Sequence, residues 1–275
     1  MAILITGRKG FISSHLKPYL ESKGERIILF LDDTTKKENF DRFNSKEEIE
    51  AVIHLAGKLG GRNKKQIWQA NYEGTKNLIE FCQGRKVGRI IFLSTARVLS
   101  RFQDPYINSK KEAEKLIVNS GISYIILRPN LVFGPGDKKN LGFLLNLIRR
   151  LPLVPVFKFL MQPLFIDDLV KIISASLKMP VNQKYNLVGL ETISYYDIIK
   201  ALKSLGYKLK IINLPFVFNW LIKIFSLTPI SPMPYWQVRT LLASEIYQGD
   251  NWPKIFKINP TSFREGLKKQ LNIKN

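Results

Sequence analysis

The chain has few cysteines, histidines and acidic residues, and it has no long apolar run. A single cysteine, Cys82, excludes an internal disulfide framework and is typical of a reducing compartment. The only histidines, His15 and His54, lack metal-ligand spacing to other residues, so we predict structural roles for both and no metal site. No apolar run approaches the roughly 18 residues of a membrane-spanning helix, and the first residues lack the pattern of a secretory signal. We therefore expect a cytoplasmic globular protein.

Basic residues outnumber acidic ones by 43 to 22, which gives a formal net charge of +21. Such an excess favours anionic partners such as phosphates, nucleic acid or an acidic membrane face. The lysines are spread along the whole chain, and no nucleic-acid recognition motif or aromatic-rich basic stripe accompanies them, so we expect no nucleic-acid partner. The nearly apolar segment 214–225 predicts a buried helix, and peripheral contact with a membrane surface is the alternative.

The first half of the sequence alternates short apolar runs with helical patterns, which is typical of a parallel α/β sheet. We predict strands at 2–6, 26–31, 51–57, 89–95 and 123–129, and helices at 11–23, 71–83 and 107–119. The second half is less regular. There we predict a helix over 141–150, a turn through Pro152 and Pro155, a strand and helix over 163–177 capped by Asp167 or Asp168, and helices over 194–205, 215–226, 234–244 and 261–270.

A glycine-containing turn, TGRKGFIS, joins the first predicted strand to the first predicted helix. Gly7 permits a tight turn, and Gly10 lets the backbone approach a pyrophosphate, which the N–H groups of the helix starting near Phe11 then face. The third small position of the motif is Ser13. This context predicts a dinucleotide-binding turn.

The choice between NAD and NADP stays open. Asp32, at the end of the second predicted strand, is placed to bind an adenosine ribose diol and favours NAD, with Asp33 as the alternative in register. Arg8 favours NADP, because a guanidinium in this turn can pair with the additional phosphate.

A tyrosine followed four residues later by a lysine occurs at Tyr19/Lys23, Tyr72/Lys76, Tyr106/Lys110 and Tyr196/Lys200. The spacing alone selects none of them. Only Tyr106 opens the helix that follows a strand ending in a hydroxyl residue, Thr95, at the sheet edge where ligands bind. A free phenol has a pKa near 10, and the Lys110 ammonium on the same helical face is expected to lower it. We predict that Tyr106 is a general acid/base, that Lys110 tunes it and that Thr95 orients a carbonyl oxygen.

With these residues the chain resembles the extended short-chain dehydrogenase/reductases of the NAD-dependent epimerase/dehydratase family. The motifs that carry the resemblance are ITGRKGFISSHL, VIHLAG, NYEGTKNL, IIFLSTARV, PYINSKKEAE, LRPNLVFGPGD and FIDDLVKII. The resemblance implies Thr95, Tyr106 and Lys110 as the catalytic set. The cofactor-binding residues that we predict are Gly7, Arg8, Lys9, Gly10, Phe11, Ile12, Asp32, Leu55, Ala56, Gly57, Asn71, Tyr106, Lys110 and Pro129.

The implied fold is α/β, a Rossmann-type doubly wound parallel sheet with a smaller C-terminal α+β substrate domain. We assign 1–128, with 163–180 returning to it, to the dinucleotide-binding domain, and 129–162 and 181–275 to the substrate-binding part. The implied activity is NAD- or NADP-dependent oxidation, reduction or epimerisation of a nucleoside-diphosphate sugar in bacterial surface-polysaccharide synthesis. A degenerate accessory or sensor protein without turnover is the alternative, and a homodimer is left open.

The sequence departs from the family pattern on the substrate side. Many members have an asparagine where this chain has Leu131, with Asn130 displaced by one position. The arginine often found before the Asp-Asp helix is replaced by Met161 and Gln162.

Overall fold

The computed structural model describes residues 2–139, 141–156, 159–213, 223–228, 230–231 and 234–273. The chain divides into two compact units. The first comprises Met1–Pro129, Ile166–Leu187 and Gly249–Ile258, and the second comprises Asn130–Phe165, Val188–Gln248 and Asn259–Asn275.

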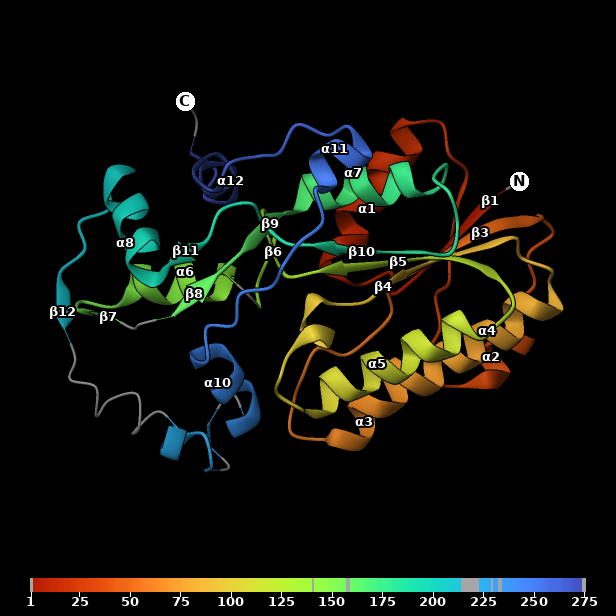
Figure 1. Ribbon diagram of the computed structural model, residues 1–275, viewed down its shortest axis with the longest axis horizontal. Coiled ribbons are helices and arrows are strands. Elements are labelled where there is room, and N and C mark those ends of the chain that lie inside the picture. The colour runs from red at the N-terminus through yellow and green to blue at the C-terminus, as the bar shows by residue number, and fades with distance from the viewer. Residues whose placement is uncertain are drawn as a thin grey trace. The chain divides into compact units, whose positions relative to one another are not determined.

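A six-stranded parallel sheet forms the centre of the first unit (Figure 1). Its strands, in spatial order, are β10 (Gln183–Leu187), β5 (Ser123–Pro129), β4 (Arg89–Leu93), β3 (Ile49–His54), β1 (Ala2–Thr6) and β2 (Ile27–Leu29). The chain runs from β1 outward to β2 and then back to β3 on the other side of β1, so the strand order reverses at β1. In an open α/β sheet this reversal opens a crevice at the carboxyl ends of the strands, where ligands bind.

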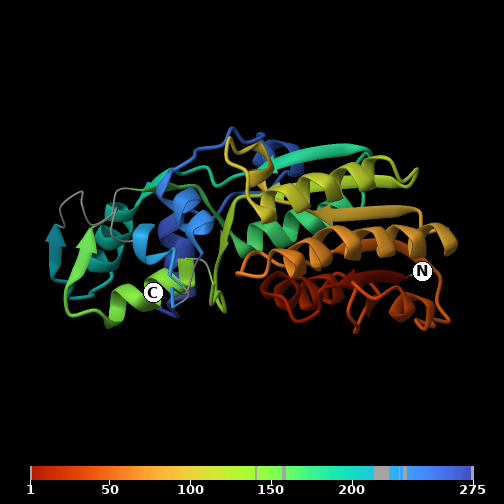
Figure 2. The same cartoon turned by 90° about the horizontal axis from the view of Figure 1, so that it is seen from below.

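Helices cover both faces of this sheet, as the predicted doubly wound fold requires (Figure 1). Helices α1 (Phe11–Ser22) and α7 (Ile166–Ser176) pack together on one face. The other face carries α2 (Lys37–Asp41), α4 (Gly74–Gly84) and α5 (Pro105–Val118), and Figure 2 shows α4 and α5 side by side. The remaining helices of the unit are α3 (Lys64–Trp68), a π-helix at Gln69–Glu73, a 3₁₀ helix at Ala96–Leu99 and α11 (Trp252–Phe256).

Apolar side chains are buried on both faces of this sheet, and one large cluster lies between the sheet and the α2/α4/α5 layer. All five residues of β1 are buried, which explains the uninterrupted apolar run AILIT, because a parallel strand is covered on both faces. Phe30 stacks on Phe40 with ring centroids 4.3 Å apart, and Phe81 and Cys82 of α4 pack into the same cluster. Burial raises the pKa of the Cys82 thiol to about 12, so this thiol is inert at neutral pH.

The second unit is built from short strand pairs and helices. Its pairs are β6 (Leu131–Phe133) with β9 (Pro163–Phe165), β7 (Val154–Val156) with β12 (Ile211–Asn213), and β8 (Leu160–Met161) with β11 (Ile193–Ser194). Its helices include α6 (Leu141–Arg150), α8 (Tyr195–Ser204), α10 (Tyr235–Leu242) and α12 (Phe263–Gln270). Gly266 lets α12 approach β6 and β9, since a Cβ there would lie 2.7 Å from the Phe133 ring.

The structure differs from the sequence predictions in several elements. Pro155, which we expected in a turn, lies inside β7. Among the described residues this strand pairs only with β12, and proline is tolerated on an edge strand. Helix α7 begins at Ile166, so Asp167 and Asp168 lie in its first turn and do not precede it as caps. Strand β10 also belongs to the sheet of the first unit, whereas the segment that we predicted to return to this unit ends at residue 180. The helix predicted at 215–226 lies largely outside the described residues; 223–225 are described and helical.

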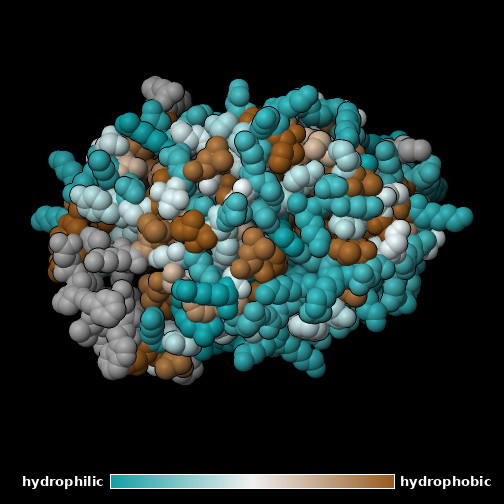
Figure 3. All heavy atoms as spheres, in the orientation of Figure 1, coloured by the Kyte–Doolittle hydropathy of each residue, from teal (hydrophilic) through white to brown (hydrophobic). Residues whose placement is uncertain are grey.

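No helix within the described residues is long and apolar enough to cross a membrane. On the side of the molecule seen in Figure 3, hydrophilic surface predominates over α4 and α5. The exposed positions of these helices include Lys76, Gln83, Asn108 and Lys115.

Candidate active site

The turn after β1 has the geometry that a phosphate group needs. Gly7 has a φ of +78°, and a Cβ there would lie 2.7 Å from the backbone nitrogen of Ala56, so no other residue fits without displacement. Gly10 closes the turn by donating its N–H to the Gly7 carbonyl at 2.9 Å. As the N-cap of α1, Gly10 supplies no side-chain cap, and the first turn of α1 carries no acidic residue. The first N–H groups of α1 are therefore left for an anion, which fits a dinucleotide pyrophosphate.

The hydrogen bonds near this turn distinguish Asp32 from Asp33, the two carboxylates considered for ribose recognition. Asp33 is used locally, because its carboxylate accepts a hydrogen bond from the Thr35 N–H at 2.9 Å. The exposed Asp32 carboxylate has no hydrogen bond to any described residue. Arg8 donates from Nε to the Leu31 carbonyl at 3.2 Å, which holds the guanidinium beside the end of the second strand. Arg8 and the segment that carries Asp32 thus lie side by side after the second strand.

Buried hydroxyl and imidazole groups join the carboxyl ends of β1 and β3. The Thr6 hydroxyl and His54 Nδ1 are 2.6 Å apart, and His54 Nε2 lies 3.1 Å from the Thr75 hydroxyl. Burial, with a smaller effect from the Lys110 charge, lowers the pKa of His54 to about 3. His54 is therefore neutral at physiological pH and acts as a structural connector. The Ala56 N–H donates to the Thr6 hydroxyl at 3.3 Å, which fixes the segment Leu55–Gly57 beside the glycine turn.

Asn71 connects the loop after β3 to the first turn of α5. It is fully buried within the π-helix, and it exchanges two hydrogen bonds with the Lys58 backbone at 2.8 and 3.0 Å. Its amide also donates to the Ser109 hydroxyl at 2.9 Å, which in turn donates to the Tyr106 carbonyl. With every polar atom of its amide engaged, Asn71 is a positioning residue for the helix that carries Tyr106.

Thr95 and Tyr106 come together at the end of β4. Thr95 is the N-cap of the 3₁₀ helix, where its hydroxyl accepts from the Arg97 N–H at 3.3 Å. Tyr106 is the second residue of α5, and both side chains are buried. Burial raises the pKa of the Tyr106 phenol, and the Arg97 charge and a hydrogen bond with Thr95 partly offset that effect.

The cation that lowers the Tyr106 pKa is therefore Arg97, whereas we expected Lys110. The Arg97 guanidinium carbon lies 5.4 Å from the centre of the Tyr106 ring. It is held there by Asp104, whose carboxylate pairs with Arg97 at 2.5 Å and also caps α5 by accepting from the Ile107 N–H at 2.8 Å. Sequence reasoning missed both residues, although an aspartate directly before a proline at a helix start is a recognisable cap signal.

Lys110 lies one helical turn beyond Tyr106 and is buried. Its ammonium donates to the Leu93 carbonyl at 2.6 Å and lies 4.4 Å from the centre of the Phe92 ring. Burial lowers the pKa of Lys110 to about 8, and the charge of Glu114 acts in the opposite direction. A Cβ placed on Gly57 would be 3.8 Å from the Lys110 ammonium, so the lysine reaches the loop that follows β3.

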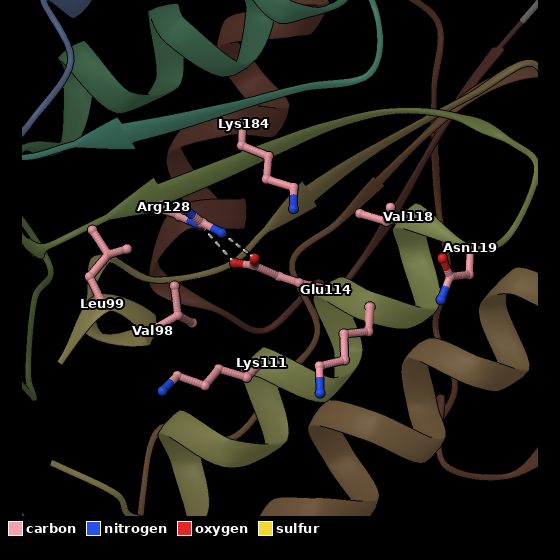
Figure 4. A pocket seen from close by; sticks show the side chains of 9 residues that line it. Val98, Leu99, Lys111, Glu114, Val118, Asn119, Arg128 and Lys184 are labelled. Carbon is pink, nitrogen blue, oxygen red and sulfur yellow. Dashed lines mark hydrogen bonds and ion pairs between the residues drawn. The ribbon is translucent and has the colours of Figure 1, made fainter. Parts of the chain in front are cut away.

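Glu114 fixes α5 to the ends of two strands and was not predicted from the sequence. Its carboxylate accepts two hydrogen bonds from Arg128 of β5, at 2.9 and 2.6 Å (Figure 4). It also accepts one from the Ser94 hydroxyl. Ser94 directly precedes Thr95, and Glu114 is one helical turn from Lys110. This buried ion pair therefore sets the distance between the helix and the strand that carry the catalytic candidates.

The predicted site residues thus gather at one edge of the sheet, in three groups. The first is Gly7–Ile12 with Asp32, the second is Leu55–Gly57 with Asn71, and the third is Thr95, Tyr106 and Lys110. Pro129 ends β5 opposite Leu187 of β10, on the strand that pairs with β4 through Leu93 and Leu127. Gln162, at the position of the expected arginine, is buried and pairs through both amide atoms with the Tyr247 backbone, at 3.1 and 2.9 Å. Among the described residues, no cluster of His, Cys, Asp and Glu could hold a metal ion.

Comparison with known proteins identifies the family and the fold. Residues 3–188 match the model of the NAD dependent epimerase/dehydratase family. The chain is 25% identical to mouse short-chain dehydrogenase/reductase family 42E member 1, over 78% of this chain and 70% of that protein. It is 26% identical to UDP-glucose 4-epimerase of Vibrio cholerae, over 73% of this chain and 74% of that protein. The crystal structure of Thermotoga maritima UDP-glucose 4-epimerase with UDP-glucose has the same fold, with a TM-score of 0.81 and 20% identity over 99% of this chain and 98% of that one.

Proposed function

This chain belongs to the NAD-dependent epimerase/dehydratase family of enzymes, and we propose that it oxidises, reduces or epimerises a carbon of a nucleoside-diphosphate sugar. The observation that carries the proposal is the pairing of Thr95 with Tyr106, both buried, at the sheet edge that also holds the glycine turn. The proposal includes a role in bacterial surface-polysaccharide synthesis.

In this proposal Tyr106 moves the proton and Thr95 orients the reacting oxygen. During reduction the Tyr106 hydroxyl gives its proton to the carbonyl oxygen, and during oxidation the phenolate takes it back. The Thr95 hydroxyl donates a second hydrogen bond to the same oxygen. When bound, the nicotinamide supplies or accepts the hydride at carbon. A hydride at carbon and a proton at oxygen together convert the carbonyl to an alcohol.

The pKa values of the site support this division of roles. Because burial raises the pKa of Tyr106, the phenol is neutral at physiological pH and is ready to act as an acid. Arg97, near the ring, stabilises the phenolate that the reaction leaves behind. Lys110 keeps its charge at pH 7, since its pKa is about 8. We assign its ammonium to the ribose hydroxyls of the nicotinamide half, because it lies close to Gly57.

The glycine turn supplies the dinucleotide contacts in this proposal. The free N–H groups at the start of α1 bind the pyrophosphate, and the Gly7 and Gly10 positions leave room for it. Asp32 binds the adenosine ribose of NAD, or Arg8 binds the additional phosphate of NADP. Parallel titrations with NAD and NADP decide between these residues. If the protein prefers NAD and Asp32→Ala abolishes that preference, the Asp32 carboxylate recognises the ribose.

The second unit is the proposed substrate-binding part. Two proteins similar to this chain are UDP-glucose 4-epimerases, and one was solved with UDP-glucose, which supports a nucleotide-sugar substrate. Leu131 and Gln162 replace polar residues common in the family, and Gln162 is fully engaged with the Tyr247 backbone. We therefore expect the diphosphate of the substrate to be held by residues other than these two.

The function is tested in two steps. Titration with NADH and NADPH, followed by nicotinamide fluorescence, should show saturable binding of at least one cofactor. Incubation with a panel of UDP- and dTDP-linked sugars, including 4-keto sugars, should then give hydride transfer or epimerisation with at least one. Tight dinucleotide binding without turnover of any member of the panel would contradict the proposal and support an accessory or sensor role.

A further inference from the structure

An open surface cavity of about 320 Å³ lies beside α5 in the first unit, at the edge of the sheet formed by β5 and β10. Its lining comes from four elements: the 3₁₀ helix, α5, β5 and β10 (Figure 4). The lining residues are Val98, Leu99, Lys111, Glu114, Lys115, Val118, Asn119, Arg128 and Lys184. Tyr106 and Lys110 are not among them, although they belong to the same helix. The cavity is therefore separate from the candidate active site.

The charges around this cavity do not cancel. Glu114 is the only acidic residue of the lining, and its carboxylate is already saturated by Arg128 and Ser94. Lys115 forms an exposed ion pair with Glu112 at 2.7 Å. Lys111 and Lys184 have no ion pair with any described residue, and Figure 4 shows Lys184 extending from its strand toward α5. Two lysines without an ion pair to a described residue thus line this concave surface, one from α5 and one from β10.

The remaining lining is apolar or neutral. Leu99 and Val118 keep 46% and 37% of their surface exposed; Leu99 lies beside Val98 at one end of the lining, and Val118 lies at the other end (Figure 4). A ligand that suits this surface has an anionic group for the lysines and an apolar or ring portion for the apolar side chains at one of these ends. Two or more ammonium groups interact more strongly with a doubly charged phosphate than with a singly charged carboxylate, because the Coulomb energy scales with charge.

We infer that this cavity is a second anion site, which binds the phosphate group of a phosphorylated small molecule or of an anionic lipid headgroup. The Glu114–Arg128 pair forms its floor, and Lys111 and Lys184 provide the binding charges. This site does not depend on the proposed catalytic function, because none of its binding charges belongs to the glycine turn or to the catalytic candidates.

The experiment compares two double variants of equal charge. Lys111→Gln/Lys184→Gln removes the binding lysines of the cavity. Lys23→Gln/Lys46→Gln removes two lysines outside its lining, at the end of α1 and in the segment between β2 and β3. The glycine turn is first saturated with the dinucleotide that the protein binds. Calorimetric titration with inorganic pyrophosphate, at fixed ionic strength near 0.15 M, then gives the dissociation constant of the cavity for each protein, and acetate serves as the monovalent reference. All four positions are at the surface or border the cavity, so urea unfolding should show similar midpoints.

The expected result is at least a tenfold loss of pyrophosphate affinity in the cavity variant and less than a twofold loss in the control variant. Equal losses in the two variants would assign binding to general surface charge and overturn the inference, as would the absence of saturable binding to any phosphate probe. Flotation with phosphatidylglycerol vesicles, compared with phosphatidylcholine vesicles, identifies the source of the phosphate group. If the protein binds phosphatidylglycerol vesicles through these lysines but does not bind soluble pyrophosphate, the ligand is a lipid headgroup.

Discussion

The two parts of the proposed site at the sheet edge are built in different ways. The turn after β1 presents backbone N–H groups, and the side chains of Arg8 and Lys9 in the turn and of Asp32 after β2 are exposed. The region at β4 and α5 presents side chains, and Thr95, Tyr106 and Lys110 are all at least 95% buried. The first part depends on backbone shape, so glycine matters there more than charge. The second depends on buried polar groups, so we expect the loss of any one of these side chains to lower stability or activity strongly.

The largest expected effect is on the buried ion pair under the catalytic helix. Glu114→Gln leaves Arg128 without its charge partner, and breaking a buried pair in this way is expected to lower the free energy of unfolding by about 3 kcal/mol. The matched control is Glu112→Gln on the same helix, whose exposed pair with Lys115 should contribute less than about 1 kcal/mol. Urea unfolding measures both, and equal losses would show that the buried pair does not fix the helix.

The next effect concerns the hydroxyl at the end of β4. Thr95→Val keeps the size of the side chain but removes the hydrogen bond to the reacting oxygen, so we expect turnover to fall by about 10²-fold. The dinucleotide dissociation constant should stay within twofold, because Thr95 belongs to the side-chain part of the site. Thr95→Ser restores the hydroxyl and should recover most of the activity. A serine variant as slow as the valine variant would refute a role for the hydroxyl.

A smaller effect is expected in the backbone part. Gly7→Ala places a Cβ 2.7 Å from the Ala56 nitrogen at a φ of +78°, so we expect a loss of about 2 kcal/mol in stability together with weaker dinucleotide binding. Turnover at saturating cofactor should be nearly retained. Gly84→Ala is the control, since nothing lies within 4 Å of a Cβ there and its φ is not left-handed. Equal stability of the two variants would mean that the turn tolerates a side chain.

The smallest expected effect is the pH dependence of stability that Lys110 causes. The unfolded lysine has a pKa of 10.5 and the folded one about 8, so between these values the unfolded state binds more protons and stability rises with pH. Relative to Lys110→Met, the wild type should therefore gain about 1 to 2 kcal/mol between pH 7 and pH 9.5. Chemical denaturation at both pH values measures this gain. A constant difference would place the folded pKa of Lys110 near its ordinary value.

The sequence predicted the backbone part of the site better than the side-chain part. Strand β1, the glycine turn and helix α1 follow from an apolar run and a local glycine pattern, which are both local signals. The position of Tyr106 after Thr95 also indicated that these two residues would meet. The direction of the Tyr106 pKa shift was predicted wrongly, because it depends on burial and on Arg97, which is held in place by Asp104. The connections of Glu114 and Asn71 join positions 13 to 38 residues apart, and no periodic pattern marks them.

The second unit was the least predictable part of the fold. Its strands are two or three residues long, and such short runs carry no usable alternation of apolar and polar residues. Helices α6, α8, α10 and α12 were predicted close to their observed bounds, since each has a clear apolar face. Strand β10 was missed because QKYNL has only one buried residue, and it is placed by its pairing with β5.

The central claim is that the turn after β1 binds the dinucleotide while Tyr106 performs the proton transfer. The most direct test is to measure the dinucleotide dissociation constant and the single-turnover rate of the same Tyr106→Phe protein. We predict a dissociation constant within twofold of wild type and a rate reduced by about 10³-fold. A rate within a few-fold of wild type would contradict the assignment of Tyr106 as the acid/base, whatever the cofactor affinity.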